Sequence, residues 1–306
     1  MALDLSSRAM IAHLSIRGIW SAVAEDERVT AEVAKQHGVS SDIGRYLKKV
    51  CDPKKIASLK DFNAKRAALY NMHRAKTLAW DDKGGRLLPA PEYFNYMADI
   101  DTAKVAMMTA YEVFLNELPA IKAKFQTDPE TAGLYRDEDW PDVNELRARV
   151  DVRVRIQPLA DPNHFLVKLG DEVEANIKAG IQKDVFSKLS AGLGDLVGRL
   201  KDVVTDAQER MAGYQVNAEG KTVKTFRDSA ITNVRDMVAD ARKLNVIGDP
   251  TLNTLLNEIE AQLCTKDPQA LRDNFILRKK AVNDAGSLAA KLANIENVLC
   301  SQGEAA

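Results

Sequence analysis

The stretch DEVEANIKAGIQKDVFSKLSAGLGDLVGRLKDVVTDAQERM, residues 171–211, decides the fold class. Its apolar residues recur at steps of three and four, at Val173, Ile177, Ile181, Val185, Leu189, Leu193, Leu196, Leu200, Val203 or Val204, Ala207 and Met211. This spacing places them on one stripe of an α-helix. A helix of this length, at about 1.5 Å per residue, is roughly 60 Å long. Such a stripe needs facing helices, and we expect residues 222–245 and 268–299 to supply coiled-coil-like packing.

Further helices follow from their start signals and periodicity. Aspartate caps a helix and proline suits its first turn, so four of the five Asp-Pro pairs predict helices at 53–79, 129–135, 250–264 and 268–299. Apolar spacing predicts helices over 3–24, 30–37 and 91–125, with Gly38 ending the second and Pro119 kinking the third.

One segment breaks the helical pattern. Residues 150–156 alternate apolar and charged side chains, and a second β-rich run covers 165–169, which together predict a hairpin around residues 160–163. The expected fold is therefore mainly α: an elongated helical bundle with long coiled-coil-like helices and one small β-hairpin. A helical bundle with a hairpin resembles helical pore-forming toxins, but Arg153, Arg155, His164 and Lys168 make membrane insertion costly.

The same patterns divide the chain into consecutive parts. We expect an N-terminal helical region at 1–127, an acidic linker with the hairpin at 128–169, a long-helix bundle at 170–300 and a tail at 301–306.

The composition indicates which class of protein this is and where in the cell we expect it. The chain has 306 residues and a formal net charge of −1, which is typical of a soluble globular protein. Its cysteines, Cys51, Cys264 and Cys300, are far apart and predict neither a disulfide framework nor a zinc module. Because no long uncharged apolar stretch and no signal-peptide pattern occurs, we expect a cytoplasmic protein without a membrane partner.

Charge is unevenly distributed along the first half of the chain. Residues 45–76 hold ten basic residues against Asp52 and Asp61, a net charge of +8, with Tyr46, Phe62 and Tyr70 interleaved. Such a segment is able to contact a polyanion or an acidic protein surface, or it is a solvated helix face. The candidate contact residues are Arg45, Lys48, Lys49, Lys54, Lys55, Lys60, Lys65, Arg66, Arg74 and Lys76.

An acidic segment follows the basic one. Residues 92–151 contain thirteen acidic against six basic residues, densest at 136–142. The two segments can pair with each other inside the fold, which is the simpler interpretation, or they can steer docking with a partner or a second copy.

Recognised catalytic and cofactor motifs are missing from the sequence. It contains no GxSxG, no GxxxxGK[ST], no HExxH and no calcium-loop pattern, so we assign no catalytic, cofactor-binding or metal-binding residues and expect no cofactor. Gly192, Gly194 and Gly198 approximate a nucleotide-binding spacing but lie inside the long helical stripe, which favours close helix packing or a hinge.

The first 125 residues resemble a known but uncharacterised family. The residues that carry the resemblance are Leu14–Trp20, Ser41–Pro53 with Lys48-Lys49 and Asp52-Pro53, Lys65–Leu78 and Leu87–Pro89. They resemble a domain of unknown function from phages and mobile elements. The resemblance implies a non-enzymatic accessory protein, often encoded beside a MoxR-type AAA+ ATPase and a von Willebrand A-like protein.

The expected function is therefore non-enzymatic. We expect a helical interaction or scaffold protein, an adaptor that acts with a protein partner such as an AAA+ ATPase or a second copy of itself. The alternative is a nucleic-acid-binding protein that uses residues 45–76. An enzyme remains possible only where folding gathers distant histidines and acids.

Overall fold

The computed structural model describes residues 5–164, 167–216 and 222–305, and it divides the chain into two compact units. Unit 1 comprises residues 1–13, 74–96 and 155–306, and unit 2 comprises residues 14–73 and 97–154. Each unit therefore joins segments that lie far apart in the sequence, whereas the sequence patterns suggest consecutive parts. The chain is mainly helical and carries three small sheets among its described residues.

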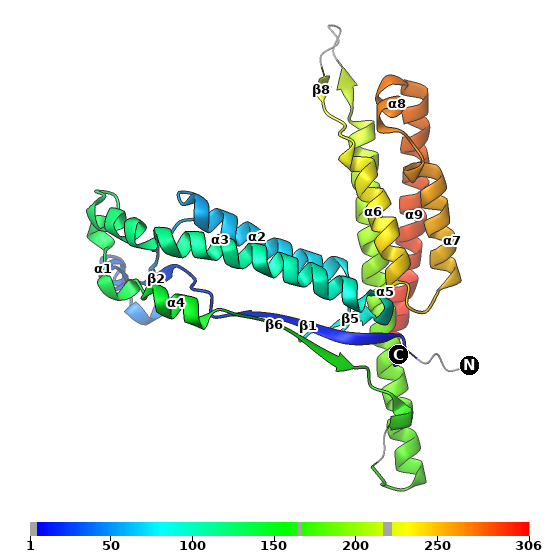
Figure 1. Ribbon diagram of the computed structural model, residues 1–306, viewed down its shortest axis with the longest axis horizontal. Coiled ribbons are helices and arrows are strands. Elements are labelled where there is room, and N and C mark those ends of the chain that lie inside the picture. The colour runs from blue at the N-terminus through cyan, green and yellow to red at the C-terminus, as the bar shows by residue number, and fades with distance from the viewer. Residues whose placement is uncertain (1–4, 165–166, 217–221, 306) are drawn as a thin grey trace. The chain divides into compact units, whose positions relative to one another are not determined.

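Unit 1 is built around the predicted long helix, α5 (Asp171–Ala212). The other helices of this unit are α6 (Ser229–Leu244), α7 (Pro250–Ile259), α8 (Pro268–Asp273) and α9 (Phe275–Ala305). Figure 1 shows α9 running alongside α5, with α6 and α7 against the pair. The predicted stripe is buried from Leu189 to Met211, where α6, α7 and α9 supply the facing side chains.

The Asp-Pro pairs mark helix starts in unit 1 as expected. Asp249 accepts a hydrogen bond from the backbone N–H of Leu252, and Asp267 accepts one from that of Ala270, each with proline following in the first turn. The helix predicted at 250–264 is α7 followed by a π-helical turn at Glu260–Cys264. The helix predicted at 268–299 is divided into α8 and α9 at Asn274, which has an extended backbone.

Glycines on α5 lie where other elements approach closely. A Cβ atom at Gly192 would lie 2.6 Å from the carbonyl oxygen of Ala79, and one at Gly198 would lie 2.8 Å from a carboxylate oxygen of Glu296. Both positions therefore serve packing, in agreement with the packing interpretation of the glycine spacing.

A four-stranded sheet packs against α5. Its strand order is β4 (Leu78–Ala79), β5 (Arg86–Pro89), β1 (Ala9–Arg17) and β6 (Asp151–Pro158). The prediction of a helix at 3–24 is wrong, because Ala9–Ala12 pair antiparallel with Arg86–Pro89. Apolar residues at helical spacing also fit a strand whose two faces are both partly buried, and the partner strand lies far away in the sequence.

The predicted hairpin at 150–169 is not confirmed by the described residues. Its first half forms β6, but β6 neighbours β1 in the sheet and is not paired with residues 167–169, which are not a strand. Residues 165–166 lie outside the described residues. A two-stranded sheet appears instead in the predicted turn after α5, between β7 (Gln215–Val216) and β8 (Thr222–Lys224), whose connecting residues 217–221 also lie outside the described part of the chain.

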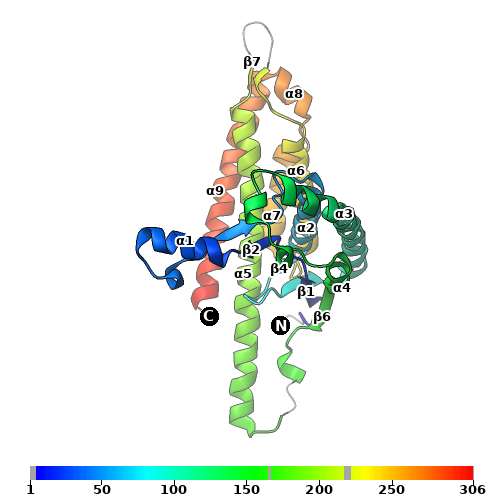
Figure 2. The same cartoon turned by 90° about the vertical axis from the view of Figure 1, so that its left-hand side faces the viewer.

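Unit 2 packs two long antiparallel helices together. These are α2 (Ala57–Ala75) and α3 (Tyr93–Thr127), and each continues a short way into unit 1. Both helices were predicted, and their side-by-side course is clear in Figures 1 and 2. The rings of Phe62 and Tyr111 are 4.8 Å apart between centroids, and both side chains are buried. α3 continues through Pro119 without interruption.

Shorter elements complete unit 2. They are β2 (Val23–Glu25), α1 (Glu27–His37), β3 (Leu47–Lys49) and α4 (Val143–Arg149), with 3-10 turns at Ser41–Ile43, Ala132–Leu134 and Asp137–Asp139. The helix predicted at 30–37 begins earlier, capped by Asp26, and ends at the left-handed Gly38 as expected. The prediction of a helix at 129–135 is wrong, because this segment forms turns and one 3-10 turn.

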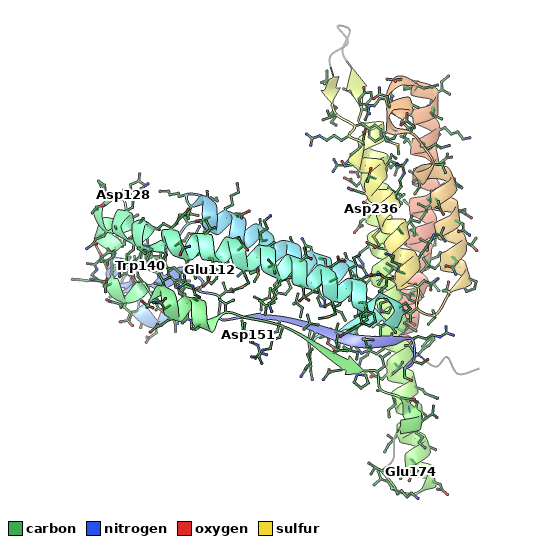
Figure 3. All side chains as sticks on the ribbon, in the orientation of Figure 1. Glu112, Asp128, Trp140, Asp151, Glu174 and Asp236 are labelled. Carbon is green, nitrogen blue, oxygen red and sulfur yellow. The ribbon has the colours of Figure 1, made fainter. Side chains whose placement is uncertain are left out.

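One end of unit 2 is closed by aromatic side chains. Trp140, labelled in Figure 3, lies with its ring centroid 6.1 Å from that of Trp20 and 5.6 Å from that of Phe125. Nearby, Gly18 has a φ of +75°, and a Cβ atom there would lie 1.9 Å from the carbonyl oxygen of Arg149. Only glycine fits where the end of β1 meets the end of α4.

Candidate functional site

The ten candidate basic residues do not share one unit. Arg74 and Lys76 belong to unit 1, and the other eight belong to unit 2. In unit 1, the carbonyl oxygen of Arg74 accepts a 2.9 Å hydrogen bond from Arg199, so the end of α2 is held by an arginine from α5.

Lys48 is buried, contrary to its prediction as a contact residue. Its side chain is 3 % exposed and its ammonium lies 3.1 Å from Asp26 and 2.7 Å from Asp139. It also donates a 2.9 Å hydrogen bond to the carbonyl oxygen of Leu134. Because all three directions of the ammonium are occupied by protein oxygens, Lys48 is unable to contact a partner.

Burial and charge act in opposite directions on Asp26. Burial raises the pKa of its carboxyl group, but the hydrogen bonds from Lys48 and from the Val29 N–H, with the positive charges of Lys48 and Arg28, outweigh it and lower the pKa overall. The group is therefore a stable anion that caps α1 and neutralises Lys48. Lys48, Asp26 and Asp139 therefore form a buried ion-pair cluster, which we call the lock. It joins β3 to the start of α1 and to the 3-10 turn at 137–139.

The acidic segment covers the basic one only in part. Besides the Lys48–Asp139 pair, Lys55 lies 3.0 Å from Glu130, and both of these side chains are mostly exposed. Other acids in the segment pair elsewhere in unit 2, as Asp137 does with Lys122 and Glu112 with Arg147. Figure 3 labels Glu112 on α3, on the side of that helix toward α4.

The remaining basic residues on α2 do not form one positive face. Relative to Lys60, Lys65 and Arg66 are rotated around the helix by roughly 140° and 240° at about 100° per residue. Arg66 lies over the ring of Phe62, with its guanidinium carbon 5.8 Å from the ring centroid. A helix that tracks nucleic-acid phosphates presents its cations on one side, and α2 does not.

A different exposed surface occurs where β2 and β3 pair. Val23 lies opposite Lys49, Ala24 opposite Lys48, and Glu25 opposite Leu47. Since side chains alternate across a strand, one face of this ribbon buries Lys48 and the other exposes Val23, Glu25, Leu47 and Lys49.

Exposed residues also lie in the segment that precedes β3. Ile43 is 75 % exposed and Leu47 is 62 % exposed, and Arg45 lies between them in the sequence and forms a 3.4 Å pair with Glu25. We define the ribbon surface as Val23, Ile43, Arg45, Leu47 and Lys49. Its two cations, Arg45 and Lys49, were among the predicted contact residues. Its apolar residues were not, because their exposure depends on strand alternation beside the buried Lys48.

Metal-binding clusters and the protonation of two cysteines bear on the chemistry that the described titratable groups could support. Within residues 5–164, 167–216 and 222–305, no group of three His, Cys, Asp or Glu side chains is placed to hold a metal ion. Burial raises the pKa of the Cys51 thiol to about 12 and that of Cys264 to about 11, so both are held as neutral thiols. No helix in the described chain is long and apolar enough to cross a membrane.

Unit 1 contains a pocket of about 510 Å³ between α7 and α9. Thr251, Thr254, Leu255 and Ile295 contribute to its lining. The two charged residues among those that line it, Glu258 and Lys291, pair with each other at 2.5 Å. The pocket therefore presents a mixed apolar and hydroxyl surface, with its charges already neutralised.

Comparisons with known proteins complete the description of the site. A scan against family models and searches of curated proteins and of solved structures found no match to this chain.

Proposed function

We propose that this chain is a non-enzymatic adaptor that docks a protein partner on the ribbon surface of unit 2. The observation that carries the proposal is the exposure of Val23, Ile43 and Leu47 beside Arg45 and Lys49. Burying such apolar side chains is the main driving force of protein association. Because Arg45 is paired with Glu25, Lys49 is the cation that favours a partner whose interface is apolar at its centre and acidic at its rim.

The buried lock beneath the surface supports the same proposal. Lys48 fixes β3 to the start of α1 and to residues 134 and 139, so the ribbon is held in place before any partner binds. A surface that is ordered in advance loses less entropy on binding. The resemblance to a phage and mobile-element family adds an AAA+ ATPase as the first partner to test.

Partner capture with matched variants tests the proposal. Tagged full-length protein is purified from its native host, together with the variant Leu47→Asp/Lys49→Glu and the control Val105→Asp. Val105 is an equally exposed apolar residue of unit 2, on α3 and outside the ribbon surface. We expect one protein to be retained by the wild type and the control and lost with the ribbon variant.

Direct titration decides the result. The captured protein is purified and its Kd is measured by calorimetry, and we expect the ribbon variant to bind about tenfold or more weakly, because buried apolar anchors dominate interface energies. Equal affinities of the wild type and the ribbon variant would remove the proposal.

Nucleic-acid binding is the competing outcome. It requires the exposed cations of unit 2, so the informative variant is Lys49→Ala/Lys54→Ala/Lys60→Ala/Lys65→Ala, which leaves the buried Lys48 intact. Gel-shift assays with duplex and single-stranded DNA at low salt give its signature: binding that weakens steeply as salt rises and that this variant loses. That result, with no protein captured, would replace the adaptor proposal.

A further inference from the structure

A second exposed surface of this kind lies at one end of unit 1, at the start of α9. Phe275 is 65 % exposed and Ile276 is 79 % exposed, although they open the helix that packs along α5. Lys279 and Lys280 follow one turn later and are exposed. Figure 1 shows this end of the bundle beside α8 and the β7–β8 pair.

These four side chains form one face of α9. With about 100° of rotation per residue, Phe275, Ile276, Lys279 and Lys280 fall within an arc of roughly 140°. Ala281, on the opposite side, is buried in the core of unit 1. We define this face as the tip surface: Phe275, Ile276, Lys279 and Lys280.

The start of α9 departs from ordinary folding preferences in two ways. Large apolar side chains are normally buried, and two adjacent ones this exposed contribute nothing to the core. Acidic residues favour the first turn of a helix, because the helix dipole is positive there, yet the first turn of α9 has none, and three consecutive cations follow it at 278–280. Departures from local preference without a gain in the fold are expected at functional positions.

Fixed arginines beside the tip surface give it a defined geometry. Arg278 donates hydrogen bonds to the carbonyl oxygens of Leu271 and Arg272 and lies over the rings of Tyr214 and Phe275. Arg272 bonds to the carbonyl oxygen of Phe226 and forms a 2.6 Å pair with Asp228. The junction of α8 and α9 is thus tied to the residues that flank β7 and β8.

We propose that the tip surface docks an acidic amphipathic segment of a protein partner, whose apolar side chains cover Phe275 and Ile276 and whose carboxylates pair with Lys279 and Lys280. Charge complementarity selects an acidic occupant. A protein segment is favoured over an anionic lipid surface because a flat surface would also meet Asp273, which is exposed two residues before Phe275, whereas a short segment is able to lie along α9 and avoid it. This surface lies on unit 1 and does not depend on the ribbon surface, so the two proposals can fail separately.

The test uses full-length protein and a defined probe. The probe is a fluorescein-labelled helical peptide with leucines at positions spaced three and four apart and glutamates elsewhere, and its counterpart carries lysine in place of every glutamate. We expect fluorescence anisotropy to show saturable binding of the glutamate peptide and none of the lysine peptide.

Three variants locate the binding. Phe275→Ser/Ile276→Ser and Lys279→Glu/Lys280→Glu should each weaken binding of the glutamate peptide by about tenfold. The control Phe186→Ser/Lys183→Glu alters an exposed aromatic residue and an exposed lysine on α5 and should bind as the wild type does. Equal thermal unfolding of all variants shows that the changes act on the surface.

Specific outcomes overturn the proposal. It fails when the glutamate peptide does not bind, when both peptides bind alike, or when the tip variants bind as tightly as the control. A membrane would replace the protein partner if vesicles of phosphatidylserine and phosphatidylcholine bind the wild type but not the tip variants, while the glutamate peptide does not bind the wild type.

Discussion

The ammonium of Lys48 lies 2.7 Å from a carboxylate oxygen of Asp139, and this contact joins the basic and the acidic segments of the sequence inside unit 2. Asp26 holds the same ammonium from the other side at 3.1 Å. Lys48, a predicted contact residue of the basic segment, is therefore a buried structural element. Its neighbour Lys49, on the opposite face of the same strand, remains exposed.

Removing the charge of Lys48 should destabilise the protein strongly. In Lys48→Met, the carboxylates of Asp26 and Asp139 stay mostly buried without their partner, and breaking a buried pair in this way costs about 3–5 kcal/mol. Urea denaturation measures the loss in the free energy of unfolding. Lys49→Met is the matched control and should change it by no more than about 0.5 kcal/mol. A Lys48→Met protein as stable as this control would show that the lock carries no stability.

Stability should also fall in acid because of Asp26. The pKa of this carboxyl group is lower in the folded chain than its ordinary value of 3.8, so the folded state prefers the ionised form. The resulting stabilisation is fully present above pH 3.8 or so and is lost as the pH falls through the folded-state pKa. Asp26→Asn should therefore be less stable at neutral pH and lose less stability between pH 5 and pH 2. Parallel pH profiles of the two proteins, from denaturant titrations, would contradict this assignment.

Gly18 should not tolerate a side chain. Gly18→Ala introduces a Cβ atom 1.9 Å from the Arg149 carbonyl oxygen, in a backbone region that favours glycine. Gly38→Ala is the control, since Gly38 also has positive φ but no atom within 4 Å of the added Cβ. The control should lose about 1–2 kcal/mol from the backbone conformation alone, and Gly18→Ala should lose clearly more. Thermal unfolding of both variants compares the two losses, and equal melting temperatures would exclude the close contact.

Alanine substitutions at two glycines of α5 should change the stability of the protein in opposite directions. Gly192→Ala places a Cβ atom 2.6 Å from the Ala79 carbonyl oxygen and should destabilise unit 1, because backbone rather than a movable side chain has to shift. Gly180→Ala in the same helix meets open space and should stabilise the protein by up to about 1 kcal/mol, since alanine favours helix. Denaturant titrations measure the free energy of unfolding, and changes of opposite sign in the two variants support the packing role of Gly192. A Gly192→Ala protein as stable as the wild type would refute it.

The sequence alone determined the helical class and most of the long helices. The stripe from Leu189 to Met211, the periodicity of α3 and the Asp-Pro caps at 249 and 267 are local signals, and a helix satisfies its hydrogen bonds within one segment.

Only the tertiary structure decided the strands and the surfaces. β1 is a strand because residues 86–89 pair with it, and a strand depends on partners that local periodicity does not reveal. Lys48 and Lys49 are adjacent and chemically identical, yet strand alternation and two distant carboxylates bury the first and leave the second free to meet solvent. Likewise Phe275 and Ile276 open a helix that was expected to face the long stripe, and they are exposed because the opposite side of α9 packs into unit 1.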